Sequence, residues 1–543
     1  MVEHRSSATR RWTARSLAVL VVGVWVLVGA AMPASAKARL VPISGSGSTW
    51  SQNALDAWRA NVKQYGMTIN YSGVGSTTGR TNFANGSVDY AVSEIPYGVD
   101  GDSRPGRGFA YMPIVAGGTS FVYNLRIGGK KVTNLRLSGA VITKIFTGGI
   151  TKWNDPAIRA DNPGLALPAR KIVPVVRSDG SGTTAQFVTW MNSEHASIWK
   201  PYCTGQGVAA GACSVRSFFP YGKGAGASTV GQSGSLGVAG YVAQGRSEGT
   251  ITYVEYSYSF KYGLPAAKVL NKAGYYIEPK ATAVAVALQK AQIASDLTQR
   301  LVGVYRNADR RTYPLSSYSY MVVPTKLQNG FTADKGYTLG KFAYYFLCQG
   351  QQQADPLGYS PLPINLVQAG FTQVKKIPGV EVQSINIKGC NNPTMSSDGS
   401  NQLAKIAPFP PACDKQGTTQ CSTGTGGAKG STQTSNTGGN TNGGGNSNGG
   451  GTNGGGANGN TPGGAAGGPS AGPGTVIDPD TGEILAAGGG GGGEQLVAGQ
   501  AVSLDGAGGW QLRHTMMVVA IVLLIALIIG PPLLTQRLRG VRK

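Results

Sequence analysis

The octapeptide RSDGSGTT, residues 177–184, brings together the residue types that bind a small oxyanion. Arg177 supplies a permanent cation. Ser181 and Thr183 supply hydroxyl donors on either side of the bare backbone of Gly182. The pattern AQFVTWM follows at once and predicts a helix whose N-terminus begins at these residues. Free backbone N–H groups and the partial positive charge of a helix N-terminus attract an anion, so the octapeptide predicts an anion site.

The same order of strand, glycine turn, hydroxyl and helix occurs two more times, in ISGSGSTW at 43–50 and in NYSGVGSTTGRTNF at 70–83. One such loop is common in α/β proteins, whereas three in one domain favour a shared site. Nucleotide motifs do not fit. GVGSTTG has its third glycine one residue too late for the dinucleotide pattern, and no loop carries the Gly-Lys-Ser/Thr of a phosphate loop.

The residues needed for catalysis or for metal binding are few. The chain has three histidines, His4, His195 and His514, and CxxC is absent. A histidine-based metal cluster or a serine–histidine pair therefore cannot be assembled. The hydroxyls near Arg177 have no evident base to activate them, so we interpret them as donors and expect no enzyme, no metal and no cofactor.

Strand and helix patterns alternate through the middle of the chain. Runs such as VDYAV, KIVPVV and TITYVEY predict strands, and longer amphipathic stretches between them predict helices. The first helix is expected within STWSQNALDAWRANVKQYG, with Ser48 or Thr49 as its N-cap and Gly66 at its end. These patterns indicate an α/β fold.

The N-terminal residues 1–36 are predicted to be a secretory signal peptide. Basic residues precede an uncharged run, which ends in the small residues Ala34-Ser35-Ala36. An uncleaved signal anchor is the alternative. The binding domain is then expected at 37–413.

The C-terminal part has the composition of a tethered anchor. Residues 414–509 are rich in Gly, Asn and Thr and are predicted to be a disordered linker. The apolar segment 510–536 is long enough to cross a bilayer as one helix. The basic tail 537–543 then lies in the cytoplasm by the positive-inside rule. The expected location is the cell membrane, single-pass, with the domain on the extracellular side.

The chain is strongly basic, with 48 Lys and Arg against 25 Asp and Glu and a formal net charge of +23. Such an excess steers anions toward the protein. Nucleic acid is not an expected partner, because the basic residues are dispersed without a cluster in an exported chain.

The six cysteines of an exported chain favour disulfides. The short separation of Cys203 from Cys213 suggests a closed local loop. Cys348 with Cys390 and Cys413 with Cys421 complete one of the fifteen possible connectivities, which the spacing leaves open.

With these residues in view, the chain resembles the PstS family, the phosphate-binding proteins of bacterial phosphate ABC transporters, over 40–408. The combination of two loops, IFTGGITKWNDPAI and RSDGSGTT, is the specific part. The other matching segments are ISGSGSTW, INYSGVGSTTGRTNFANGSVDYAVSEIP, GSLGVAGYV and GTITYVEYSYSFKYGLPAAKVLNKAG. The resemblance implies a type II periplasmic-binding-protein-like fold of two hinge-connected lobes. Lobe 1 is expected at about 40–124 and 311–413, and lobe 2 at about 125–310.

The resemblance also implies a set of phosphate ligands in the cleft. Arg177 would supply the cation, and Asp179 would hold it in place. The expected donors are Thr49, the backbone N–H of Trp50, Ser76, Ser181, Gly182 and Thr183.

The acidic position of the family is the instructive one. An aspartate in the segment that matches VSEIP accepts a hydrogen bond from the proton of hydrogen phosphate, and here that residue is Glu94. Sulfate has no such proton and would leave the acceptor unpaired. One extra methylene displaces the carboxylate by about 1.5 Å. Trp50 also stands where the family commonly has phenylalanine.

The expected function is an extracellular, membrane-tethered and monomeric protein that binds inorganic phosphate and delivers it to ABC permease subunits. Arsenate or a phosphonate is the next ligand, and sulfate the least expected. Two alternatives stay open: a surface adhesin or phosphate-sensing protein, and a secreted phosphatase-like enzyme that uses the same pocket.

Overall fold

The computed structural model describes residues 38–430 apart from 225–227, 385–386, 397 and 429, together with the strand residues 476–477 and 484–485. The chain divides into two compact units, 1–442 and 443–543, and each is considered by itself. In the described residues no helix is both long enough and apolar enough to span a membrane. The predicted signal peptide at 1–36, the predicted span at 510–536 and the basic tail lie outside the described residues.

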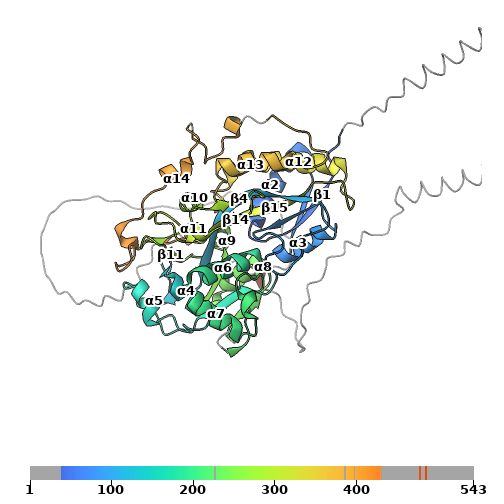
Figure 1. Ribbon diagram of the computed structural model, residues 1–543. Coiled ribbons are helices and arrows are strands. Elements are labelled where there is room, and N and C mark those ends of the chain that lie inside the picture. Colours follow the sequence, from blue (N-terminus) through green and yellow to red (C-terminus); the bar gives the residue numbers. More distant parts are fainter. Residues whose placement is uncertain are drawn as a thin grey trace, which may run out of the picture. The chain divides into compact units, whose positions relative to one another are not determined.

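One mixed sheet of eight strands organises the first unit (Figure 1). Its order is β2 (Ile69–Gly73), β1 (Ile43–Gly47), β3 (Tyr90–Ser93), β15 (Ser316–Pro324), β4 (Phe109–Tyr123), β10 (Thr250–Glu255), β8 (Val173–Arg177) and β9 (Val230–Gln232). The first three strands are parallel, and so are the last three. The long strands β15 and β4 run antiparallel between the two groups. Two parallel groups joined by long crossing strands are the two-lobe arrangement that the sequence predicts.

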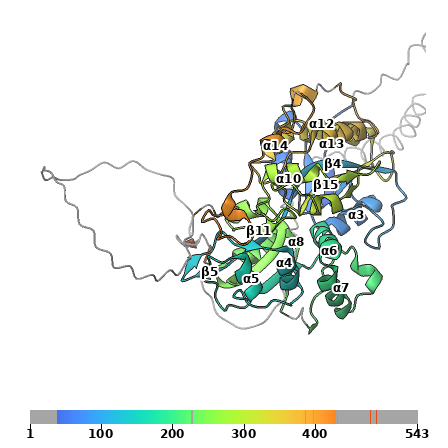
Figure 2. The same ribbon diagram turned by 60° about the vertical axis from the view of Figure 1, so that its left-hand side comes forward.

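Helices cover both parallel groups, and the two views place α12 and α13 at one end of the unit and α4, α5 and α7 at the other (Figures 1 and 2). The helices are α2 (Gln52–Asn61), α3 (Ser76–Ala84), α4 (Gly139–Phe146), α5 (Pro156–Asp161), α6 (Gly182–Glu194), α7 (Ala196–Gly205), α8 (Gly234–Ala243), α9 (Ser257–Lys261), α10 (Ala281–Leu288), α11 (Val302–Tyr305), α12 (Ala333–Leu347), α13 (Ile364–Val374) and α14 (Gln402–Ile406). Short strands form a three-stranded sheet and two hairpins: β12 (Tyr276–Ile277), β11 (Lys268–Leu270) and β7 (Arg136–Leu137), β13 (Gln292–Ile293) with β14 (Gln299–Arg300), and β5 (Arg126–Ile127) with β6 (Lys130–Lys131).

The first helix ends as predicted but begins differently. Helix α2 is extended by a 3₁₀ turn at Val62–Tyr65 and ends at Gly66, whose φ of 76° is left-handed and suits glycine. Neither predicted hydroxyl caps the start of α2. Ser48 Oγ instead accepts a hydrogen bond from the backbone N–H of Trp50 at 2.9 Å. This local turn competes with helix capping, so the helix starts only at Gln52.

All three cysteine pairs form disulfides, Cys203–Cys213, Cys348–Cys390 and Cys413–Cys421. Residues 281–310, predicted to belong to lobe 2, contact elements on both sides of the predicted boundary. Helix α10 contacts α14 and β15. Gln299 also bonds to the backbone of Tyr318. α10 and Gln299 therefore pack on the crossing strand β15, whereas α11 contacts α6 of the second group, and the predicted boundary of lobe 2 stays a prediction.

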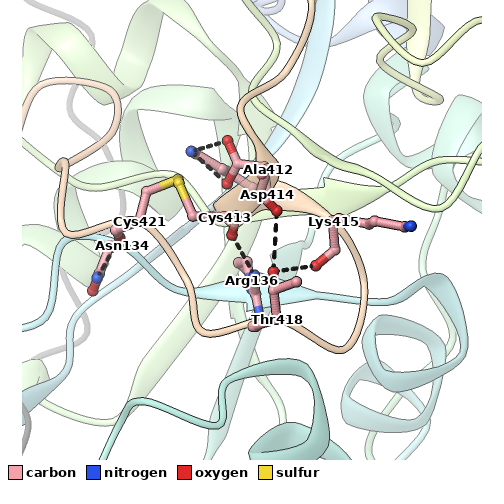
Figure 3. Close-up of a disulfide and its surroundings, with 9 residues drawn as sticks. Asn134, Arg136, Ala412, Cys413, Asp414, Lys415, Thr418 and Cys421 are labelled. Carbon is pink, nitrogen blue, oxygen red and sulfur yellow. Dashed lines mark hydrogen bonds and ion pairs between the residues drawn. A yellow bond between two sulfur atoms is a disulfide. The ribbon is translucent and has the colours of Figure 1, made fainter.

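The domain continues beyond residue 413, which corrects the predicted start of the linker at 414. We call residues 412–428 the C-terminal strap (Figure 3). Arg136 is fully buried and donates to the carbonyl oxygens of Cys413 and Thr418 at 2.8 and 2.7 Å. Asp414 forms an ion pair with Lys268 at 2.7 Å. A Gly- and Thr-rich composition indicated disorder, but these tertiary bonds hold the backbone of the strap.

The strap also adds backbone pairing to the sheet region behind it. The N–H of Thr425 donates to the carbonyl of Thr133 at 3.0 Å, and its hydroxyl donates to Ala266 at 2.6 Å. Further along the predicted linker, β16 (Val476–Ile477) pairs antiparallel with β17 (Ile484–Leu485) in the second unit. The paired residues are apolar and β-branched or leucine, which suits a short strand pair.

A chain that ends at residue 413 is expected to unfold at a lower temperature than one that ends at residue 430. The shorter chain lacks the partner of Cys413, whose loop contributes about 2–3 kcal/mol by closure entropy. It also lacks the partner of Lys268. Thermal denaturation followed by circular dichroism measures the difference, with the full-length chain as the reference. Equal midpoints would show that the strap adds nothing to the domain.

Candidate functional site

The predicted anion loops meet where parallel strands of both groups end. The loops after β1 and β2 belong to the first group, and the loops after β8 and β9 belong to the second. The carboxyl ends of parallel strands are the usual place for ligands in α/β sheets. Two hydrogen bonds join the loop after β2 to the loop after β8. The N–H of Thr77 donates to the carbonyl of Gly180 at 3.1 Å, and the N–H of Gly182 donates to Ser76 Oγ at 3.1 Å. The lobes are therefore in contact at the site.

Arg177 ends strand β8 and is 2% exposed. Its Nε donates to Asp179 Oδ1 at 2.6 Å, and its Nη2 pairs with the other carboxylate oxygen. The N–H of Gly234 donates to the same Oδ1 at 2.9 Å. Burial raises the pKa of Asp179, but the bonds and charge of Arg177 outweigh it and hold that pKa below its usual value. In this structure Asp179 thus forms a two-bond ion pair with Arg177, in line with the role predicted for it.

Ser235, at the start of α8, links Thr49 to Arg177 by hydrogen bonds. Thr49 Oγ1 is 2.8 Å from Ser235 Oγ and accepts from the N–H of Ser235 at 3.0 Å. Ser235 Oγ in turn lies 3.4 Å from Arg177 Nη1. The hydroxyl of Thr49 therefore faces the second lobe, beside the arginine.

Trp50 contacts Ser48 and Tyr359 in this structure, and its predicted role toward a ligand stays a prediction. Its backbone N–H, expected to donate to a ligand, donates to Ser48 Oγ. Its indole is 1% exposed and packs edge-on against Tyr359, with the ring centroids 5.7 Å apart. Because the local turn at Ser48 already uses this N–H, Trp50 is part of the core that supports the loop in this structure.

Glu94 follows strand β3 and is completely buried. Ser76 Oγ donates to its Oε2 at 2.9 Å, and Ser319 Oγ donates to its Oε1 at 2.7 Å. Burial raises the pKa of Glu94, while hydrogen bonds from Ser48, Ser319 and Ser76 and the charge of Arg177 oppose that rise. The structure thus places a hydrogen-bonded carboxyl group within the electrostatic reach of the arginine.

The start of helix α6 completes the site. Ser181 is its N-cap and accepts from the N–H of Thr184 at 3.2 Å. Thr183 is 1% exposed, and its hydroxyl has no partner among the residues that the structure describes. Only glycine fits at position 182, because a Cβ there would lie 2.1 Å from Glu94 Oε2 and 2.7 Å from Ser76 Oγ.

The arrangement suits an anion that carries a proton. Arg177 and the amides and hydroxyls of the α6 terminus can donate to anionic oxygens, and Glu94 can accept one proton. Within the described part of the chain, no group of three or more His, Cys, Asp and Glu side chains could hold a metal ion.

Sequence analysis missed two of the polar side chains at the site, Ser235 and Ser319. Ser235 lies in GSLGVAGYV, a segment that carried the family resemblance without an assigned ligand. Its position after Gly234 at a helix start could have identified it. Ser319 lies within a strand, where no local signal marks a hydroxyl that reaches a distant carboxylate.

The PBP superfamily domain profile matches residues 30–349. The phosphate-binding protein PstS of Xylella fastidiosa (strain Temecula1 / ATCC 700964) is 33% identical over 337 residues, which cover 62% of this chain and 85% of the relative. PstS of Pasteurella multocida (strain Pm70) is 31% identical over 344 residues, covering 62% and 92%. The solved structure of a high affinity periplasmic phosphate-binding protein bound with phosphate aligns at a TM-score of 0.48 and 18% identity, covering 64% of this chain and all of the other.

Proposed function

The chain belongs to the PBP superfamily and, within it, to the PstS family of phosphate-binding proteins, and on this basis we propose that it binds inorganic phosphate between its lobes and delivers it to an ABC transporter permease. Like its relatives, which are phosphate-binding proteins, it is a binding protein and not an enzyme.

The observation that carries the proposal is the pairing of one buried cation with one buried acceptor. Arg177 is oriented by Asp179 and has one more guanidinium nitrogen, Nη1, facing the hydroxyl of Ser235. Hydrogen phosphate would accept from this arginine and from Ser181, Gly182 and Thr183. Its proton would go to Glu94. A micromolar site needs about 8 kcal/mol of net binding free energy, which a few charge-assisted hydrogen bonds can supply.

Glutamate in place of the family's aspartate bears on the choice of ligand. The longer side chain turns one oxygen toward Ser319, at 2.7 Å, and the other toward Ser76. This arrangement leaves Oε2 next to Gly182. We propose that Oε2 accepts the proton carried by an oxygen of the ligand. We therefore rank phosphate first, then arsenate or a phosphonate, and sulfate last. Thr49 and Ser76 are further proposed donors, and Trp50 supports the loop.

We propose that residues 1–36 are a signal peptide, that residues 510–536 span the membrane once and that the basic tail 537–543 lies in the cytoplasm. The linker would start after residue 430 and not at residue 414. The described domain reaches residue 430, which leaves about 80 residues of linker before the proposed span at 510–536. A Gly-rich chain of that length has a root-mean-square span of roughly 50 Å. The domain would work as a monomer outside the cell, close to the permease. The phosphatase and adhesin alternatives are not favoured, since the relatives are named phosphate-binding proteins.

Uptake of radiolabelled phosphate by cells that lack this gene tests the delivery step. Cells complemented with the intact gene are expected to take up phosphate faster at low external concentration than cells complemented with Arg177→Ala. Equal uptake by both strains would contradict a role for this site in transport.

A further inference from the structure

Strand β15 pairs with β3 up to the residue before Glu94. The pairing is antiparallel and regular, with Val322 opposite Ala91, Met321 opposite Val92 and Tyr320 opposite Ser93. The next residue of β15 is Ser319, and the next residue after β3 is Glu94. The cross-strand register therefore brings Ser319 beside Glu94 at the point where Glu94 leaves β3.

The two oxygens of Glu94 have different neighbours. Oε1 accepts from Ser319 Oγ at 2.7 Å, and both side chains are completely buried. Oε2 accepts from Ser76 of the first lobe and faces the second lobe, since a Cβ at position 182 would lie 2.1 Å from it. Oε1 is thus hydrogen-bonded to the crossing strand β15, and Oε2 faces the cleft.

We propose that Ser319 is a specificity-determining positioning residue, which holds Glu94 Oε1 on the crossing strand and leaves Oε2 as the single oxygen that accepts the proton of bound hydrogen phosphate. This inference rests on the proposed function. Glu94 has one more rotatable bond than the family's aspartate, and the hydroxyl of Ser319 would hold it in a single conformation.

The bond from Ser319 also favours the ionised form of the buried carboxyl group. Burial raises the pKa of Glu94, and a hydrogen bond donated to the charged form opposes that rise. Arg177 of β8 acts in the same direction, and Tyr71 of β2 is the other titratable group that interacts with Glu94. Without the hydroxyl of Ser319, Glu94 would take up a proton at higher pH, and a protonated carboxyl group would no longer reject sulfate.

Calorimetric titration of the full-length protein with phosphate and with sulfate, between pH 5 and 8, tests the proposal. Ser319→Ala is expected to reduce the ratio of phosphate to sulfate affinity by on the order of ten-fold, the size expected for one hydrogen bond to a charged group. On acidification, the variant should also lose its preference for phosphate over sulfate at a higher pH than the unchanged protein does. Ser319→Thr keeps a hydroxyl and should restore both properties.

Ser317→Ala is the matched control. Ser317 lies on the same strand and is 2% exposed, and its hydroxyl has no partner among the described residues. This variant should keep the unchanged protein's ratio and pH profile. A Ser319→Ala protein that behaves like Ser317→Ala overturns the proposal. An unchanged protein that binds no phosphate instead overturns the proposed function itself.

A double variant keeps the proposal testable if Ser319→Ala does not fold. In Glu94→Gln the buried charge is gone, so adding Ser319→Ala should change the affinity ratio no further. If the serine change lowers the ratio of Glu94→Gln by ten-fold as well, the two residues act independently and Ser319 does not work through Glu94.

Discussion

Replacing Arg177 with alanine is expected to abolish phosphate binding. The guanidinium is 2% exposed and is held by two bonds to Asp179. Its removal takes away the cation of the site and leaves Asp179 buried and unpaired, facing an anionic ligand. Breaking a buried ion pair from one side costs about 3–5 kcal/mol, which corresponds to a loss of affinity on the order of a hundred- to a thousand-fold or more. Calorimetric titration with phosphate measures the loss.

Arg306→Ala is the control for the change in net charge. Arg306 is 55% exposed and pairs with Glu194 at 3.0 Å, away from the site residues named above. It should bind phosphate as the unchanged protein does. The double change of Arg177 to methionine and Asp179 to asparagine removes both charges of the pair and separates loss of folding from loss of binding. Near-normal affinity of Arg177→Ala would contradict the site.

Glu94→Gln is expected to lose most of the discrimination against sulfate. Glutamine has nearly the same shape, but its amide nitrogen can donate to an oxygen without a proton. Sites built around one buried hydrogen bond reject an analogue that lacks it by about 10⁴–10⁵, so a fall in selectivity of at least two orders of magnitude is expected. Competition of sulfate with labelled phosphate measures the ratio. An unchanged ratio would show that Glu94 does not detect the proton.

The same residue predicts how selectivity changes with pH. Burial raises the pKa of Glu94, so the carboxyl group takes up its proton at a higher pH than a free glutamate does. Selectivity against sulfate should therefore fall as the solution is acidified. The raised pKa also means that protonation stabilises the unliganded fold, an effect present below the unfolded pKa and lost as pH rises through the folded pKa. Glu94→Gln should lose this stability effect, and its selectivity should keep only the pH dependence that comes from the titration of phosphate itself.

Much of the fold follows from local sequence signals. Strand and helix periods alternate, and a glycine turn with hydroxyls follows β1, β2 and β8, so the three loops and their N-terminal donors could be predicted. The pairing of Arg177 with Asp179 was implied by the family resemblance, which includes the octapeptide that holds both. Their approach to Glu94 depended on the family resemblance, because the octapeptide and VSEIP lie far apart in the chain.

The remaining features depend on contacts between distant segments. Ser319 reaches Glu94 because β15 pairs with β3 with Tyr320 opposite Ser93, and neither strand's sequence marks that register. The C-terminal strap looks like linker by composition, yet the carbonyl oxygen of Thr418 satisfies buried Arg136. The N–H of Trp50 is occupied by a turn two residues long. In each case a tertiary or competing local bond outweighs the propensity that the sequence displays.

Calorimetric titration decides whether this protein binds phosphate and rejects sulfate. The purified full-length protein is freed of bound ligand by partial unfolding and refolding and is titrated with phosphate and then with sulfate at pH 7. We expect phosphate to bind at micromolar concentration or tighter, about 8 kcal/mol or more of binding free energy, and sulfate to give no measurable heat. Binding of neither anion, or equal binding of both, would contradict this expectation.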